Sequence, residues 1–254
     1  MSDTVLAAQL YTVRDYLKTP EDIRSSLAKV SEIGYAAVQL SALGPIEPRV
    51  LRRIADDLGL DIVATHVDYD RILTDVQSVI DDHEIWSCKN VAIGSMPQSY
   101  RDRDGFARFA RDASAVVAPL IEAGLTFSSH NHSFEFERID HRTGMEILFE
   151  ESDPERIFAE LDTYWIQHGG ANPVTWIRKL AGRIRIVHLK DMAMRGFEQK
   201  FAEVGEGSME WEPILGACRD AGVEWYIVEQ DVCPGDPFQS LEKSLHNLRK
   251  MGLN

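Results

Sequence analysis

The chain has 254 residues, of which 44% are hydrophobic and 27% charged, a composition typical of globular proteins that excludes disordered and fibrous classes. Its 27 lysines and arginines stand against 41 aspartates and glutamates, giving a formal net charge of −14. This charge disfavours nucleic-acid and anionic membrane partners, and no apolar run approaches the length that crosses a bilayer.

Short apolar runs, rich in Val, Ile, Ala and Leu, alternate along the chain with longer segments of helical periodicity. The runs recur at roughly 25 to 35 residues, the length of one strand-plus-helix unit. In chain order, the eight predicted strands are Val5–Leu10, Ala36–Leu40, Asp61–His66, Asn90–Ile93, Leu125–His130, Ile157–Asp162, Ile184–Leu189 and Val223–Glu229. Buried strands separated by helices indicate a parallel sheet covered by helices.

The helix after the first strand has clear boundary signals. Thr19 is a capping hydroxyl, Pro20 fits a first helical position, and Asp22 adds an acid to the first turn. Glycine ends this helix at Gly34. The same signal precedes three later strands, at Gly59, Gly124 and Gly222.

Eight alternating units in this length favour a closed (β/α)₈ TIM barrel over an open doubly wound sheet. A dinucleotide-binding fold lacks its main signal, because no Gly-x-Gly-x-x-Gly follows the first strand. No linker or charge block divides the sequence, so we expect one TIM-barrel domain over residues 1–254.

The cysteines and the N-terminal segment predict a cytoplasmic protein. Cys88, Cys218 and Cys233 are odd in number and widely spaced, which is typical of reduced thiols and not of a disulfide or zinc framework. The first fifteen residues lack the basic region and cleavage site of a secretory leader.

Polar side chains stand at the carboxyl ends of most predicted strands, where the chemistry of a TIM barrel gathers. They are Gln9, Gln39, His66, His130, Asn131, His132, Asp162, His188, Lys190 and Glu229. Any one of them has an ordinary structural explanation, such as a helix cap for Asp162. Together, Asp162, His188, Glu229 and one strand-five histidine offer the nitrogen and oxygen ligands that a divalent metal needs, and a cation would offset their burial.

The order and spacing of these strand ends resemble a known family. The stretches that carry the resemblance are AQLYTVRD, YAAVQLS, THVDYD, HNHSFEFE, LDTYWIQHGGANP, IVHLKD, EVGEGSMEW and YIVEQD. They resemble the sugar phosphate isomerase/epimerase-like family of the xylose-isomerase-type TIM-barrel superfamily, related to ketose 3-epimerases and inosose dehydratases. The resemblance covers the whole chain and implies one divalent metal, held by residues from strands five to eight.

The epimerases of this superfamily use Glu, Asp, His and Glu as metal ligands. The resemblance assigns three of these positions to Asp162, His188 and Glu229. The strand-five Glu has no identical counterpart, and His130 is the best match to its position. His132 is the alternative ligand, because residues two apart on a strand share a face.

The resemblance implies proton abstraction next to a carbonyl, through an enediolate stabilised by the metal. Glu229 is the expected base. Lys190 is expected either to stabilise the oxyanion or to form a salt bridge with a neighbouring acid. Because His130 replaces a carboxylate of the epimerases, a second acid or base has to come from elsewhere. Glu135, His132 and His168 are the candidates. Further hydrogen-bonding or stacking contacts to the sugar are expected from Gln9, Gln39, His66, His132, Trp165 and His168, the last two on a loop over the site.

These expectations favour a metal-dependent isomerase or epimerase acting on a ketose or keto-sugar. The alternative is a lyase, either a dehydratase or an enzyme that eliminates a β-substituent from a keto-sugar, keto-glycoside or inosose. A non-catalytic sugar-binding subunit is less favoured, and a zinc nuclease resembling endonuclease IV is disfavoured by the net charge.

Two imidazoles among the ligands favour Mn²⁺, Co²⁺ or Zn²⁺, with Mg²⁺ still open. The partner is expected to be a small sugar, and a homo-oligomer remains open. A phosphorylated sugar is disfavoured because acids accompany the glycines of Glu203–Gly207, where such barrels often bind phosphate.

Overall fold

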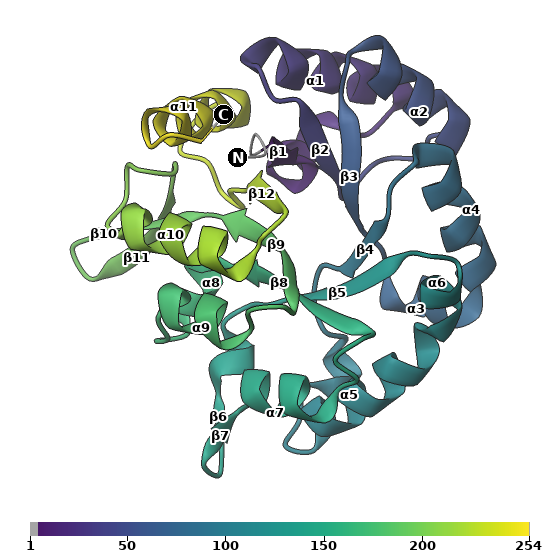
Figure 1. The fold of residues 1–254 in the computed structure, drawn as a ribbon. Coiled ribbons are helices and arrows are strands. Elements are labelled where there is room, and N and C mark those ends of the chain that lie inside the picture. The colour runs from purple at the N-terminus through teal and green to yellow at the C-terminus, as the bar shows by residue number, and fades with distance from the viewer. Residues whose placement is uncertain (1–4, 254) are drawn as a thin grey trace.

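A computed structural model describes residues 5–253. The expected lack of a leader rests partly on residues 1–4, which lie outside the described residues, as does residue 254. Parallel strands close into a barrel in the order β1-β12-β9-β8-β5-β4-β3-β2 (Figure 1). The barrel strands are β1 (Leu6–Gln9), β2 (Ala37–Leu40), β3 (Asp61–His66), β4 (Asn90–Ile93), β5 (Thr126–His130), β8 (Ile157–Asp162), β9 (Ile184–Leu189) and β12 (Trp225–Val228).

The predicted (β/α)₈ fold is confirmed. Strands β3, β4, β8 and β9 have the predicted bounds, and the other four differ by one or two residues at an end. The largest difference is at β12, which begins at Trp225 because Val223 still bonds back to Cys218 in the helix-to-strand connection. Runs of buried apolar residues therefore predict the existence of each strand reliably, but its first and last residues less precisely.

Helices surround the barrel and cover its outer face (Figure 1). They are α1 (Pro20–Ile33), α2 (Pro48–Asp57), α3 (Tyr69–Thr74), α4 (Val76–Trp86), α5 (Gly105–Val116), α6 (Ala118–Glu122), α7 (Gly144–Glu151), α8 (Thr163–His168), α9 (Pro173–Lys179), α10 (Trp211–Ala221) and α11 (Pro237–Lys250). Short 3₁₀ turns lie at Leu10–Tyr16, Gln98–Tyr100 and Phe134–Phe136. Within residues 5–253, no helix combines the length and hydrophobicity that a membrane span requires.

The predicted boundaries of α1 are confirmed. Asp22 N–H donates to the Thr19 hydroxyl at 3.2 Å, and Thr19 N–H donates to the Asp22 carboxylate at 3.1 Å. This reciprocal pair is a capping box, which satisfies two donors that the helix itself leaves free. Gly34 ends the helix with φ of 108°, a conformation that glycine adopts at little cost.

Two small hairpins were not predicted. One joins β6 (Arg138–Ile139) to β7 (Arg142–Thr143), and the other joins β10 (Asp191–Arg195) to β11 (Glu198–Ala202). The second lies outside the barrel, beside α10 (Figure 1). Both consist mainly of half-buried or exposed residues and lack the apolar run that identified the barrel strands.

The barrel interior is apolar toward the amino ends of the strands and polar toward their carboxyl ends. A small buried cluster of Ala7, Ala37, Val63, Ala64, Ile186 and Ile227 fills the apolar part. Side chains two residues apart on a strand share a face, so the next inward positions include Gln9, Gln39, His66, His188 and Glu229. This periodicity places the polar strand ends inside the barrel mouth.

Candidate active site

Four of the predicted side chains lie together at the carboxyl ends of the strands. His130 ends β5, Asp162 ends β8, His188 is on β9, and Glu229 directly follows β12. All four are buried, and one potential ligand atom from each lies within 4.8 Å of the others. The fold thus brings together two imidazoles and two carboxylates separated by up to about a hundred residues of chain.

Hydrogen bonds orient both imidazoles toward the two carboxylates. His130 donates from Nδ1 to the Gly94 carbonyl at 3.1 Å, which leaves Nε2 3.4 Å from the Asp162 carboxylate. His188 donates from Nε2 to Gln39 Oε1 at 2.7 Å and from Nδ1 to Glu229 Oε2 at 3.0 Å. Burial opposes the charge of His188, but Glu160 and Glu229 outweigh it and raise the pKa of His188 to about 10. A divalent ion would take the place of the Nδ1 proton and bind the freed lone pair. The donor set therefore fits a divalent ion.

A second polar layer lies beneath this cluster. Glu160 is fully buried, accepts from His66 Nε2 at 2.5 Å, and lies 3.0 Å from His188 Nε2. Gln39 Nε2 donates to both carboxylate oxygens, at 3.1 and 3.0 Å. Burial opposes the charge of Glu160, but His66 and His188 outweigh it and hold the pKa of the carboxyl below its usual value.

His66, Glu160 and His188 also bring ligand atoms close together. Both imidazole nitrogens already donate to a neighbouring side chain, His66 Nε2 to Glu160 and His188 Nε2 to Gln39 Oε1. We assign this layer to the orientation of His188, not to a second ion. Sequence reasoning missed Glu160. Its signal was its position two residues before Asp162 on the same strand face.

Lys190 lies at the centre of the acidic residues. Its fully buried ammonium is 2.8 Å from Asp162 Oδ2, 2.7 Å from Glu229 Oε2 and 2.6 Å from Asp231 Oδ2. Burial disfavours this charge, but the three carboxylates outweigh burial and raise the pKa of Lys190 above its usual value. Lys190 therefore compensates the same carboxylates that would hold an ion, and it is not part of the cavity wall.

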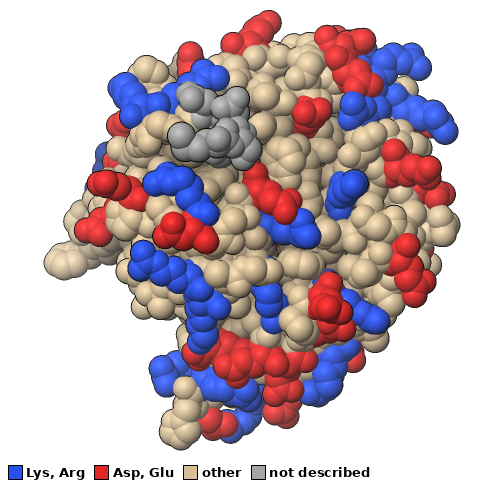
Figure 2. Space-filling model, in the orientation of Figure 1, with Lys and Arg blue, Asp and Glu red and all other residues tan. Residues whose placement is uncertain are grey.

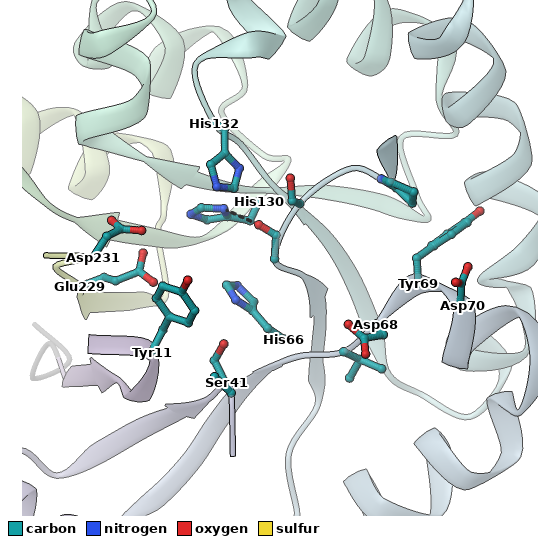
Figure 3. Close-up of a pocket in the computed structure, with 15 residues that line it drawn as sticks. Tyr11, Ser41, His66, Asp68, Tyr69, Asp70, His130, His132, Glu229 and Asp231 are labelled. Carbon is teal, nitrogen blue, oxygen red and sulfur yellow. Dashed lines mark hydrogen bonds between the residues drawn. The ribbon is translucent and has the colours of Figure 1, made fainter. Parts of the chain in front are cut away.

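A cavity of about 600 Å³ opens above the cluster (Figure 3). Of the predicted site residues, His66, His130, His132 and Glu229 line it. The rest of its wall is formed by Tyr11, Ser41, Ala42, Val67, Asp68, Tyr69, Asp70, Gly94, Ser95, Pro97 and Asp231. Glu229, Asp231 and His130 lie at one end of the view, and Asp68 and Asp70 at the other.

The predicted contacts from Gln9 and Gln39 lie below the cavity. Gln39 is buried between His188 and Glu160, as described above. Gln9 is also buried, and its Oε1 accepts from the backbone of Tyr11 at 3.3 Å. Both side chains point into the barrel, as predicted, but at a depth where they support the site and do not line the cavity.

The expectation that Trp165 and His168 lie on a loop is wrong, because both belong to helix α8. Asp162 caps this helix, with its Oδ1 accepting from Trp165 N–H at 2.9 Å, so the same carboxylate serves the helix and the cluster. The Trp165 ring packs 5.1 Å from the His132 ring and 5.5 Å from Lys190 Nζ. Trp165 thus covers Lys190, and His168 packs behind it against Tyr164.

His132 and Glu135 form a pair beside the cluster. Glu135 is buried and accepts from the His132 backbone N–H at 2.9 Å, without reaching the cavity. Burial raises the pKa of Glu135 to about 8. Burial, helped by His130 and Lys190, lowers the pKa of His132 to about 3. At neutral pH both groups are therefore mainly uncharged.

The raised pKa of Glu135 makes stability depend on pH. Between its usual value of 4.5 and about 8 the folded protein holds a proton that the unfolded chain releases. The Glu135 carboxyl group therefore adds its full contribution to the free energy of unfolding below pH 4.5. This contribution falls as the pH rises from there to about 8. We expect the free energy of unfolding of Glu135→Gln, relative to that of wild type, to be a few kcal/mol higher at pH 9 than at pH 4.5. Each pKa unit of difference between the folded and unfolded states corresponds to about 1.4 kcal/mol.

Urea unfolding of both proteins across this pH range measures the effect. Glu122→Gln, at an exposed position on α6, is the matched control and should show no such trend. Parallel pH profiles for Glu135→Gln and wild type would mean that Glu135 is ionised in the folded protein.

Asp231 is a functional candidate that sequence reasoning missed. Its side chain is 21% exposed and lines the cavity, and it pairs with Lys190 at 2.6 Å. Glu229 and Asp231 are two residues apart and point to the same side of the chain (Figure 3). The same period-two argument that placed the strand ends could have identified it.

The glycine-rich loop after β11 binds a carboxylate of the protein itself, that of Asp191. The buried Asp191 carboxylate accepts from Gly205 N–H at 2.8 Å, Gly207 N–H at 3.2 Å and Trp211 Nε1–H at 2.7 Å. These amides are the donors with which such a loop would bind a phosphate. Their use by Asp191 agrees with the expectation that this loop does not bind a phosphorylated sugar.

Acidic and basic side chains are interspersed on the face of the molecule that Figure 2 shows. On the face shown in Figure 2, red and blue side chains alternate and form no extended basic patch. A nucleic-acid groove would require such a patch. The visible surface therefore gives no support to a nuclease.

By sequence, this chain is similar to curated inosose dehydratases. An inosose dehydratase of Geobacillus thermodenitrificans is 29% identical over 147 residues, covering 51% of this chain and 49% of that protein. Another, from Geobacillus kaustophilus, is 22% identical over 84% of this chain and 82% of its own length. In the first of these matches, the chain spans about half the length of the curated relative.

Solved structures share the whole fold. A sugar phosphate isomerase/epimerase from Parabacteroides distasonis superposes with a TM-score of 0.82, at 22% identity, over 97% of this chain and 98% of the other. An L-ribulose 3-epimerase superposes with a TM-score of 0.74, at 16% identity, over 98% and 94%. Residues 27–251 match the family described as xylose isomerase-like TIM barrel. The chain belongs to that family.

Proposed function

We propose that this protein is a divalent-metal-dependent enzyme that removes a proton next to the carbonyl of a keto-sugar. The observation that carries the proposal is the buried cluster of His130, Asp162, His188 and Glu229 at the floor of the cavity. Similarity to epimerases and inosose dehydratases supports the same chemistry, because both reactions begin by breaking such a carbon–hydrogen bond.

Each residue of the cluster has a role in this proposal. His130, Asp162, His188 and Glu229 hold the metal, which, when bound, supplies Lewis-acid polarisation of the substrate carbonyl. Glu229 lines the cavity and accepts the proton from the adjacent carbon. Lys190 keeps Asp162 and Glu229 ionised, and Glu160 and Gln39 fix the orientation of His188.

An isomerase or epimerase must return the proton, whereas a lyase must expel a substituent. We favour the epimerase reading but keep the lyase as a second candidate, because His130 stands where the epimerases have a carboxylate. Asp231 is the second carboxylate near Glu229 on the cavity wall, so it is the residue best placed to assist either outcome.

Product analysis in D₂O tests the proposal. Metal-loaded enzyme is incubated with a panel of ketoses, keto-glycosides and inososes, and the products are analysed by NMR and mass spectrometry. A deuterated stereoisomer or isomer supports the favoured reading, and an unsaturated product supports the lyase. A panel with neither exchange nor elimination contradicts the proposal and favours a sugar-binding subunit.

Metal binding should stabilise the protein through Asp162. A ligand that binds only the folded state raises the melting temperature of the protein. At a ligand concentration of a hundred times the dissociation constant, the gain in the free energy of unfolding is about 2.7 kcal/mol. We expect Mn²⁺, Co²⁺ or Zn²⁺ to produce such a rise, and Asp162→Asn to remove most of it. Differential scanning fluorimetry measures the rise, with Asp220→Asn, at an exposed position on α10, as the control. An undiminished rise in Asp162→Asn would place the ion elsewhere.

A substitution at His130, the strand-five position, tests whether this residue determines which reaction the enzyme catalyses. His130→Glu restores the pair of metal-binding carboxylates that the epimerases use. If His130 directs the enzyme away from epimerisation, this variant gains epimerised product at the expense of the wild-type product. An unchanged product distribution would show that the reaction is determined elsewhere in the cavity.

A further inference from the structure

The cavity wall lacks a cation for the negative charge that the proposed reaction creates. When Glu229 removes a proton next to the carbonyl, charge develops on the carbonyl oxygen, and a hydrogen-bond donor directed at this oxygen stabilises it. Lys190 was one candidate for this donor, but its ammonium is fully buried among three carboxylates. Among the described residues, no lysine or arginine lines the cavity. A donor that the protein supplies to this oxygen is therefore an imidazole or a hydroxyl of the wall.

The imidazoles of the wall are poor candidates. His66 donates from Nε2 to Glu160 at 2.5 Å, and His130 donates from Nδ1 to the Gly94 carbonyl at 3.1 Å. Burial, helped by His130 and Lys190, lowers the pKa of His132 to about 3, so this ring is uncharged at neutral pH and has a single N–H. The hydroxyl groups of the wall remain.

Four hydroxyl groups line the cavity, those of Tyr11, Ser41, Tyr69 and Ser95. A phenol is more acidic than an aliphatic hydroxyl, so it is the stronger hydrogen-bond donor to a charged oxygen. Tyr69 lies at the end of the cavity away from Glu229, whereas Tyr11 lies at the Glu229 end (Figure 3). Tyr11 is therefore the strongest hydroxyl donor near the proposed base.

The fold attaches the turn that carries Tyr11 to the segment that carries Glu229. Tyr11 follows β1, and Glu229 follows β12, which is the neighbouring strand in the barrel. Gln230 N–H donates to the Thr12 hydroxyl at 3.0 Å, so the residue after Glu229 is bonded to the residue after Tyr11. This contact fixes Tyr11 and the proposed base relative to each other.

The Tyr11 ring is held in place while its hydroxyl is free. The Arg14 guanidinium lies 4.3 Å from the ring centroid and also donates to the Tyr11 carbonyl at 2.9 Å. Gln9 Oε1 accepts from Tyr11 N–H at 3.3 Å. Among residues 5–253 no group pairs with the Tyr11 hydroxyl, which points into the cavity (Figure 3). A fixed ring with an unpaired hydroxyl is a preorganised donor.

We propose that Tyr11 is a catalytic residue whose hydroxyl donates a hydrogen bond to the substrate oxygen that becomes negatively charged when Glu229 removes the proton. The phenol keeps its own proton throughout, so no bond to Tyr11 forms or breaks. The contact strengthens as the charge develops, and it therefore lowers the barrier more than it tightens binding of the ketose. This inference rests on the proposed function, because that reaction creates the charged oxygen.

Tyr11→Phe removes the hydroxyl and keeps the ring. With a substrate that the wild type converts, we expect kcat for exchange in D₂O to fall about 100-fold, the usual cost of removing one such donor, with KM changed less than about three-fold. The melting temperature should stay at the wild-type value, because the hydroxyl has no partner among the described residues. A merely structural role would lower the melting temperature or raise KM, and this result would contradict the inference.

Tyr16→Phe is the matched control for these rates. Tyr16 lies at the other end of the same turn, is 47% exposed, and does not line the cavity. This variant should keep the wild-type kcat. A wild-type kcat in Tyr11→Phe, or an equal loss in Tyr16→Phe, overturns the inference.

Binding of glycolohydroxamate to the metal-loaded protein tests the same contact without turnover. The two oxygens of this small molecule are arranged as in an enediolate, and one of them is charged when the hydroxamate is ionised. Calorimetry should show about ten- to hundred-fold weaker binding to Tyr11→Phe than to wild type, because one hydrogen bond to a charged oxygen is lost. Tyr16→Phe should bind as wild type does. Equal affinity of Tyr11→Phe and wild type, or no binding to wild type, overturns the inference.

The two proposals fail separately. Wild-type exchange that is undiminished in Tyr11→Phe would contradict only the role of Tyr11. A wild type that exchanges with no substrate, while Tyr11→Phe still weakens hydroxamate binding, would contradict the enzymatic function and support Tyr11 as the donor to a charged oxygen at the cluster.

Discussion

Glu229→Gln should slow proton abstraction by about 100- to 10,000-fold, the usual contribution of a positioned general base. An amide in place of the carboxylate cannot accept the proton, and it is also a poorer metal ligand. The rate is measured as exchange of substrate hydrogen with D₂O at saturating metal. Wild-type exchange in Glu229→Gln would show that another group is the base.

Two further variants separate loss of the base from loss of the metal. Glu229→Asp keeps a carboxylate but shortens the side chain by one methylene, so it should retain the metal-induced rise in melting temperature while losing most of the exchange rate. Glu224→Gln is the matched control, because Glu224 pairs with Arg185 at 2.6 Å on the surface. It should exchange at the wild-type rate.

Lys190→Met should lower the free energy of unfolding by about 3–5 kcal/mol, the usual cost of removing one partner from a buried ion pair. Lys190 is the cation nearest to Asp162, Glu229 and Asp231. The first two carboxylates are buried, so bulk water cannot replace the lost ammonium there. Urea unfolding in the presence of a chelator measures the loss.

Adding a divalent metal to Lys190→Met should restore part of the lost stability. The ion would neutralise the carboxylates of Asp162 and Glu229, which the Lys190 ammonium neutralises in the wild type. Lys243→Met is the control: Lys243 pairs with Glu206 on the surface, where such pairs contribute at most about 1 kcal/mol. Wild-type stability of Lys190→Met in chelator would mean that the carboxylates do not depend on this cation.

The sequence predicts the barrel because its strands carry the signal themselves. Each buried parallel strand requires a run of apolar residues, and each helix-to-strand connection tends to require a glycine, as Gly34 shows. Polar residues interrupt these runs only where the strand opens into the mouth. The positions of His130, Asp162, His188 and Glu229 could therefore be predicted together.

The contacts of individual side chains could not be predicted in this way. Lys190 was expected either to stabilise the oxyanion or to form a salt bridge with a neighbouring acid. The structure shows salt bridges to three carboxylates, from β8 and the segment after β12, and only the closed barrel brings these together. Trp165 was expected on a loop because it follows the strand end at Asp162. The structure forms a helix there because the Asp162 carboxylate caps it.

Glu160 and Asp231 were missed for a related reason. Each lies two residues from a predicted ligand, on the same side of the chain, and each contacts a charged or polar group that is distant in sequence. Neither residue is at the end of a predicted strand. Both lie two residues from a strand end on the same side of the chain, so the alternation of side chains along a strand could have identified them.

Anomalous diffraction from crystals grown with Mn²⁺, Co²⁺ or Zn²⁺ is the most direct test of the central claim, that these strand ends form a divalent-metal site. We predict one strong peak at the barrel mouth, between His130 Nε2, His188 Nδ1 and the carboxylates of Asp162 and Glu229. A mouth without such a peak at saturating metal, or a peak between His66 and Glu160 instead, would contradict it.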